Sequence, residues 1–137
     1  MLLKFRLRSE KEVRDRLKKK KFDAETIEDT VSFLKEKAFI DDEQFARAWI
    51  RSRVKKPLGI RRLKVELRLK GIDKAIIDAG INELKSDYSE EDVVKSIAKN
   101  RLSRLKGIDQ QKAKKRVYAY LLRRGFSPES IIEVLNK

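Results

Sequence analysis

Apolar residues recur at spacings of three and four along most of this chain, with polar residues between them, which is the pattern of amphipathic helices. The pattern predicts helices near residues 9–20, 23–37, 41–56, 59–70, 73–86, 89–106, 109–124 and 127–136. The only strand-like alternation is at Leu3, Phe5 and Leu7, and it is too short to form a sheet by itself. The predicted fold class is therefore all-α.

Three segments of the chain align with one another without gaps. When Phe22, Ile72 and Phe126 are taken as equivalent, the copies lie 50 and 54 residues apart. Apolar residues occupy matched positions in every copy: Val13, Leu63 and Val117; Leu17, Leu67 and Leu121; Ile27, Ile77 and Ile131; and Val31, Ile81 and Leu135. Because these positions are four residues apart on each side of a short break, every copy predicts two helices joined by a tight turn.

The turn between the paired helices has its own residue pattern. Gly71 and Gly125 stand where the end of a helix needs a left-handed residue, and Asp73 and Ser127 follow as N-caps of the next helix. Lys21 stands at the matching position of the first copy, where a non-glycine residue costs about 1 kcal/mol. We therefore expect the first turn to be built differently.

A further helix precedes the pair in the second and third copies. Residues 41–56 and 89–106 each begin with capping residues followed by acids, as a helix N-terminus prefers. The chain is therefore predicted to consist of three tandem three-helix units, at residues 1–37, 38–86 and 87–137, with the leading helix of the first unit incomplete.

The repeat positions also predict the core of the second unit. The residues expected to be buried there are Leu63, Leu67, Ile72, Ile77, Ile81, Phe45 and Trp49. Trp49 is the only tryptophan, and it shares a helix face with Phe45. We therefore favour a core role for Trp49 over stacking on a nucleic-acid base.

Composition excludes several classes of protein. The 137 residues contain no Cys and no His, which excludes disulfides, thiolate metal sites and the commonest general base. Glycine-rich phosphate-binding loops are absent, no apolar run approaches a membrane span of ~18 residues, and the N-terminus does not resemble a signal peptide. We expect a cytoplasmic protein that is not an enzyme and holds no cofactor.

The charge balance indicates a polyanionic partner. The chain has 36 Lys and Arg against 22 Asp and Glu, a formal charge of +14, and the excess is shared almost evenly by the three predicted units. Nucleic acid is the first candidate for such a basic protein. The high like charge also favours a monomer.

The densest basic group lies between residues 47 and 70, where Glu66 is the only acid. Its members are Arg47, Arg51, Arg53, Lys55, Lys56, Arg61, Arg62, Lys64, Arg68 and Lys70. Two sets share helical spacing and each predicts a stripe: Arg47, Arg51 and Lys55, and Arg61, Lys64 and Arg68. We interpret these stripes as a surface for phosphates or for an acidic protein groove, in preference to an ordinary solvated face.

A second basic region runs from Lys95 to Arg124 and contains a single acid, Asp109. Its residues point in several directions around their helices, so a binding role and a solvated face are equally compatible with the pattern. We take Arg116, Arg123 and Arg124 as further candidates for partner binding. Tyr120 occupies the repeat position of Arg16 and Glu66, which predicts an exposed ring next to basic residues, as in single-strand binders.

One stretch resembles a known family. The segment FIDDEQFARAWIRSR, from Phe39 to Arg53, is followed by Gly59 and by KGI at residues 70–72, and this combination resembles the signature of RecX. Leu63, Glu66 and Leu67 fit the same signature, and residues 6–22 resemble the segment before it. RecX proteins are bacterial regulators of the RecA recombinase.

The resemblance covers nearly the whole chain and carries its own expectations. It implies tandem three-helix repeats in an elongated, curved body that binds RecA–single-stranded DNA filaments and inhibits the recombinase, within DNA repair and homologous recombination. The alternative is a helix-turn-helix protein that binds duplex DNA, because each unit contains two helices joined by a tight turn.

Overall fold

The computed structural model of the chain describes residues 7–54, 58–85 and 88–136, and over these residues it contains eight α-helices and no strand. The helices are α1 (Glu10–Lys19), α2 (Ala24–Glu36), α3 (Asp42–Arg53), α4 (Ile60–Leu69), α5 (Lys74–Lys85), α6 (Glu90–Arg104), α7 (Gln110–Arg123) and α8 (Pro128–Leu135). The all-α prediction is confirmed, and each predicted helix is present with ends that differ by one to three residues.

Side-chain caps determine where most of the helices begin. The N-cap side chains that accept a backbone N–H of the first turn are Ser9, Asp23, Asp41, Ser89, Asp109 and Ser127. At α1 the cap is reciprocal, because the Glu12 carboxylate also accepts the N–H of Ser9. Each cap satisfies a backbone donor that the helix itself leaves without a partner.

The turn in the first repeat is built like the other two, so the expectation that it differs is wrong. Lys21 adopts a left-handed φ of 66°, against 79° for Gly71 and 90° for Gly125. The N–H of Phe22 donates to the carbonyl of Leu17 at 3.2 Å, the same bond that closes the other turns. These capping bonds hold Lys21 in a conformation that glycine would adopt more easily.

Three clusters of buried residues form the core, one for each set of neighbouring helices. We call α1–α2 the first unit, α3–α5 the second and α6–α8 the third. The predicted core residues Leu63, Leu67, Ile72, Ile77, Ile81 and Phe45 are all buried. Trp49 is only half-buried, which corrects the prediction, because its ring packs at the margin of the core cluster and its indole N–H donates to the partly buried carboxylate of Glu66.

The first unit is the least covered of the three. Phe22 is 48% exposed, whereas its equivalents Ile72 and Phe126 are 4% and 0% exposed. Among the described residues the first unit has two helices, so no leading helix packs over this position. Ile40, which the sequence analysis assigned to the second unit, packs with Ile27 of the first unit. Residues 86 and 87, at the predicted limit between the second and third units, lie outside the described ranges. The predicted unit limits therefore stay a prediction.

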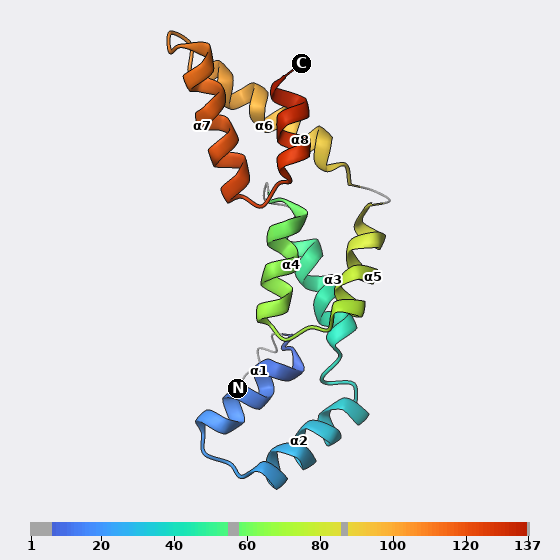
Figure 1. The fold of residues 1–137 in the computed structure, drawn as a ribbon. Helices are drawn as coiled ribbons and strands as arrows, with labels where there is room; N and C mark the ends of the chain where they lie inside the picture. The colour runs from blue at the N-terminus through green and yellow to red at the C-terminus, as the bar shows by residue number, and fades with distance from the viewer. Residues whose placement is uncertain (1–6, 55–57, 86–87, 137) are drawn as a thin grey trace, which may run out of the picture.

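The units follow one another along an elongated, curved body (Figure 1). The helix before the tight turn of each unit, which is α7, α4 or α1, lies along the same side of this body (Figure 1). The N-terminus of α1 therefore lies at the C-terminus of α4, and the N-terminus of α4 lies at the C-terminus of α7.

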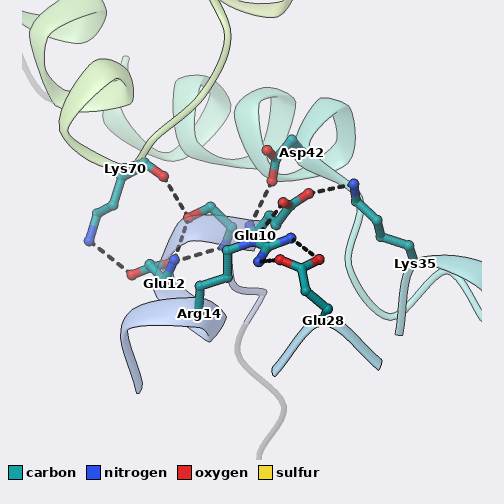
Figure 2. A network of polar contacts seen from close by, with 8 residues as sticks. Glu10, Glu12, Arg14, Glu28, Lys35, Asp42 and Lys70 are labelled. Atoms are coloured by element: carbon teal, nitrogen blue, oxygen red, sulfur yellow. Dashed lines mark hydrogen bonds and ion pairs between the residues drawn. The ribbon is translucent and has the colours of Figure 1, made fainter. Parts of the chain in front are cut away.

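Hydrogen bonds join the first and second units. The Ser9 hydroxyl donates to the Lys70 carbonyl at 2.7 Å, and the N–H of Glu10 donates to the Asp42 carboxylate at 2.9 Å. The ammonium of Lys70 also lies 3.0 Å from the Glu12 carboxylate (Figure 2). Partial burial raises the pKa of the Asp42 carboxyl, and the bond from the Glu10 N–H offsets only part of that effect.

A chain of ion pairs extends this junction into α2. The Glu10 carboxylate contacts Lys35 at 2.6 Å and Arg14 at 2.9 Å, and Arg14 also binds Glu28 (Figure 2). The hydrogen bond from Lys35 lowers the pKa of the Glu10 carboxyl, with a further contribution from Arg14. The network therefore links α1 both to its own unit and, through Asp42, to α3.

The second and third units are joined in the same way. The N–H of Gly59 donates to the carbonyl of Arg124 at 2.8 Å, as the Ser9 hydroxyl does to Lys70. The carboxylate of Glu90 accepts the N–H of Ile60 at 3.3 Å, as Asp42 accepts that of Glu10. Each junction thus pairs the N-terminus of one helix with a carbonyl and a carboxylate of the next unit.

Candidate partner-binding surface

The seam between α3 and α4 contains a compact ion-pair cluster. Glu66 on α4 accepts hydrogen bonds from Arg53 at 3.0 and 2.8 Å and from the indole N–H of Trp49 at 3.0 Å. Burial opposes ionisation of Glu66, but the bonds from Arg53 and Trp49 outweigh it and lower the pKa of the carboxyl. Arg53 therefore holds α3 to α4 in the free protein.

Two more residues of the predicted basic group are engaged at this seam and at the junctions. Arg62 lies 3.5 Å from the Glu66 carboxylate and donates to the carbonyl of Arg123 at 3.4 Å. Lys70 pairs with Glu12 of the first unit, and its ammonium lies 5.2 Å from the centre of the Trp49 ring. Both residues therefore contribute to joining the units.

Arg47 and Arg51 face the fifth helix rather than the fourth. They line a groove of about 180 Å³ between α3 and α5, together with Gly80 and Glu83. The Arg47 guanidinium lies 3.5 Å from the Glu83 carboxylate, and both side chains are at least half exposed. Lys55 and Lys56, the remaining candidates from the predicted helix at residues 41–56, lie outside the described residues.

Arg61, Lys64 and Arg68 form a separate row on α4. Arg61 and Arg68 are exposed and Lys64 is half-buried, and none of the three makes an ion pair within the described ranges. Helical geometry places this row on the side of α4 away from Glu66, which faces α3. The two predicted stripes therefore lie on different sides of the second unit, with the Arg53–Glu66 seam between α3 and α4.

Two of the three cations in the equivalent row of the first unit are paired with carboxylates. The positions of the α4 row correspond to Lys11, Arg14 and Lys18 in the sequence repeat. Lys11 pairs with Asp15 at 2.8 Å, and Arg14 is engaged by Glu10 and Glu28. The row on α4 is therefore the more available of the two for an external anion.

The third unit places its arginines around a cleft between α6 and α7. This cleft of about 300 Å³ is lined by Arg101, Arg104, Leu105, Arg116, Val117, Tyr120 and Arg123. Arg116 and Arg123 are exposed, whereas Arg124 is half-buried and its Nε atom has no hydrogen-bond partner among the described residues.

The sequence placed Arg101 and Arg104 in the second basic region, but they were not among the residues predicted to bind a partner. Arg101 lies one turn before Arg104 on the face of α6 that meets α7. The spacing of residues along a single helix does not show which residues of a second helix they will face. Tyr120 is half-buried, which corrects its predicted exposure, because the guanidiniums of Arg101 and Arg124 lie 3.4 and 5.4 Å from its ring centre.

The described residues give no support for a metal site or for a membrane-spanning helix. The described ranges contain no group of three or more Asp or Glu side chains placed to hold a metal ion. They also contain no helix with the length and apolar content that crossing a membrane requires.

The fold defines a class of protein built from tandem three-helix units, and comparison with known sequences identifies the family. Models of the first, second and third three-helix domains of RecX match residues 1–34, 41–81 and 89–135. Regulatory protein RecX of Chlorobium phaeobacteroides (strain BS1) is 39% identical over 137 residues, which cover 99% of this chain and 87% of that protein. The chain belongs to the RecX family.

A further relative agrees on the family, and two solved structures agree on the fold. Regulatory protein RecX of Clostridium beijerinckii is 33% identical over 95% of this chain, which spans 61% of the length of that relative. A crystal structure of RecX from Lactobacillus salivarius superposes with a TM-score of 0.85 at 24% identity, covering 98% of this chain and 87% of that one. A second crystal structure of RecX gives 0.82 at 20% identity, covering 97% of this chain and 66% of that one.

Proposed function

We propose that this chain binds RecA–single-stranded DNA filaments and inhibits the recombinase, and so modulates homologous recombination and DNA repair in the cytoplasm. Membership of the RecX family supports a regulatory rather than an enzymatic role, because the relatives are described as regulatory proteins. The proposal includes the monomer as the active form and needs no cofactor.

The observation that carries the proposal is the row Arg61, Lys64 and Arg68 on α4. These cations have no ion-pair partner among the described residues, and they lie near the middle of an elongated body. Unpaired surface cations bind phosphates and release condensed counterions, which favours a nucleoprotein over an uncharged protein partner. An elongated repeat body can also contact several subunits of a filament at once.

The other candidate residues take different parts in this proposal. Arg116 and Arg123 are exposed at the cleft between α6 and α7 and form a separate basic surface in the third unit. Arg47 and Arg51 form a second surface, at the groove between α3 and α5. Arg53, Arg62, Lys70 and Arg124 support these surfaces by holding the helices and units together.

A comparison of three ligands tests the proposal. We would measure binding of the full chain to bare single-stranded DNA, duplex DNA and a RecA-coated strand, each at two salt concentrations. The proposal predicts the tightest binding to the coated strand, with little preference for base sequence.

The same experiment tests the duplex-binding alternative. A helix-turn-helix protein acting on duplex DNA should prefer one site over others by ~10³ or more. Such a preference, or equal binding to coated and bare strands, would contradict the proposed filament regulator.

A further inference from the structure

The second and third units offer an internal comparison at the seam between their first two helices. Arg53 and Arg101 are each the twelfth residue of the leading helix, counted from Asp42 in α3 and Glu90 in α6. On the following helices, Glu66 and Tyr120 each lie four residues before the C-cap. By the same register Arg62 corresponds to Arg116, and Lys70 corresponds to Arg124.

In the second unit this seam contains its own anion. The Glu66 carboxylate receives two bonds from Arg53 and one from Trp49, and Arg62 lies 3.5 Å away. The side chain of Glu66 is only 17% exposed, so the cations around it are neutralised inside the protein. The arginines at the seam of the second unit are therefore already paired with a carboxylate of the protein itself.

In the third unit the cations remain but the carboxylate does not. Tyr120 replaces Glu66, and the Arg101 guanidinium lies 3.4 Å from the centre of its ring. Arg104, Arg116 and Arg123 also line the cleft, and no Asp or Glu is among its described lining residues. Four arginines thus line an open cleft of about 300 Å³ without a carboxylate among the lining side chains.

We propose that the cleft between α6 and α7 binds a phosphate group, carried either by a nucleic-acid strand or by a free nucleotide, which takes the place that Glu66 holds in the second unit. Guanidiniums bind phosphate oxygens through paired N–H donors. Arg101 and Arg104 approach from α6 and Arg116 and Arg123 from α7. A tetrahedral phosphate can accept from two opposite walls, whereas the two oxygens of a carboxylate lie in one plane.

The remaining lining residues suit a sugar phosphate. Leu105 is half-buried and provides apolar surface beside the arginines, whereas Val117 is buried. The volume is at the small end of ligand pockets, so it suits one phosphate-bearing unit better than a helix of a partner protein. The proposal does not depend on a recombinase partner, because cleft and ligand can be tested with the isolated chain.

The test follows the arginine Nε–Hε resonances of the full chain by NMR during titration. The probes are inorganic phosphate, thymidine monophosphate, a short oligothymidylate with hydroxyl ends, and polyglutamate. The proposal predicts saturable shifts of Arg101, Arg104 and Arg116 with the phosphate probes. A response to the oligothymidylate alone would assign the phosphate to a strand, and a response to the mononucleotide as well would include free nucleotides.

Variants at residue 120 give the sharpest comparison. Tyr120→Glu restores the carboxylate of the second unit and should weaken phosphate binding at least about tenfold by pairing with Arg101 and Arg116. Tyr120→Gln has a similar size without the charge and should retain binding within about threefold. Equal binding by the two variants would overturn the proposal.

A second pair of variants uses exposed residues only, so that folding is not in question. Arg104→Gln with Arg116→Gln should weaken binding about tenfold, whereas Lys99→Gln with Lys112→Gln removes the same charge elsewhere and should change it less than twofold. Equal losses in both pairs would show diffuse attraction and contradict a site. Binding of polyglutamate in the cleft as tight as that of oligothymidylate would also overturn the proposal.

Discussion

The backbone N–H of Gly59 donates to the carbonyl oxygen of Arg124 at 2.8 Å, across 65 residues of sequence. This bond joins the N-terminus of α4 to the C-terminus of α7, and the Ser9 hydroxyl makes the corresponding bond to Lys70 one junction earlier. Bonds between backbone groups depend on close approach of the chains. Residues that permit this approach should therefore control how firmly the units are joined.

The first prediction concerns the glycine at the second junction. A Cβ on Gly125 would lie 2.3 Å from the Cβ of Arg62, whereas a Cβ on Gly107 would meet nothing within 4 Å, and both residues have a φ of 90°. Gly107→Ala should therefore cost about 1 kcal/mol for backbone conformation alone. Gly125→Ala should cost about 2 to 4 kcal/mol, because overlap with Arg62 is added. If the two variants lost equal free energy of unfolding in urea denaturation, the close contact between Gly125 and Arg62 at the junction would be contradicted.

The second prediction concerns Lys21, which has a left-handed φ of 66°. Lys21→Gly should stabilise the chain by about 0.5 to 1 kcal/mol, since relief of the backbone strain exceeds the added entropy of the unfolded chain. Lys20 has a φ of −83° and provides the control. Lys20→Gly should destabilise the chain in the same thermal denaturation assay, and stabilisation by both variants would refute the argument.

The third prediction tests the repeat-based core. Leu67 is 0% exposed and Leu69, two residues later, is 72% exposed. Leu67→Ala should cost ~2–5 kcal/mol, as expected for a cavity in a packed core. Leu69→Ala should change the free energy of unfolding by no more than ~0.5 kcal/mol. A loss below ~0.5 kcal/mol for Leu67→Ala in a denaturant titration would show that the core face is wrongly assigned.

The fourth prediction concerns the pH dependence of the α3–α4 seam. The pKa of Glu66 is lowered in the folded chain, so its contribution to stability is present above its ordinary value of 4.5 and is lost as pH falls through the folded pKa. Glu66→Gln should cost about 1 to 3 kcal/mol at neutral pH, where it weakens the bonds to Arg53.

Denaturation of the wild-type chain and of Glu66→Gln across acidic and neutral pH measures this contribution. The difference between the two proteins should shrink as the pH falls below 4.5. A difference that stays constant with pH would show that the charge of Glu66 does not hold the seam.

Local rules explain why the helices were predictable from the sequence. Caps such as Ser9 and Ser127, and the glycines at residues 71 and 125, act within a few residues of themselves. Burial of Leu63 and Leu67 followed from a four-residue spacing repeated in three copies. The prediction for the turn at Lys21 failed because capping hydrogen bonds override the conformational preference of one residue.

The surface was less predictable, because it depends on which helices meet. The spacing along α3 grouped Arg47 with Lys55, but only packing shows that Arg47 faces Glu83 of α5 and that Arg53 faces Glu66 of α4. The cleft in the third unit combines residues from α6 and α7 that no single helical pattern connects. Ion pairing, rather than the count of basic residues, therefore distinguishes the structural arginines from the available ones.

The proposed role depends most directly on the α4 row, so inhibition of RecA-catalysed strand exchange by a triple variant is the decisive measurement. The triple variant carries Arg61→Gln, Lys64→Gln and Arg68→Gln, and it should inhibit strand exchange less well. It should also reduce the magnitude of the slope of log K against log salt concentration by roughly 2 to 3, which is the change expected when three phosphate contacts are lost. The control replaces Lys19, Lys85 and Lys99, which are exposed elsewhere, and should inhibit normally. Normal inhibition by the α4 variant, with an unchanged salt slope, would contradict the account.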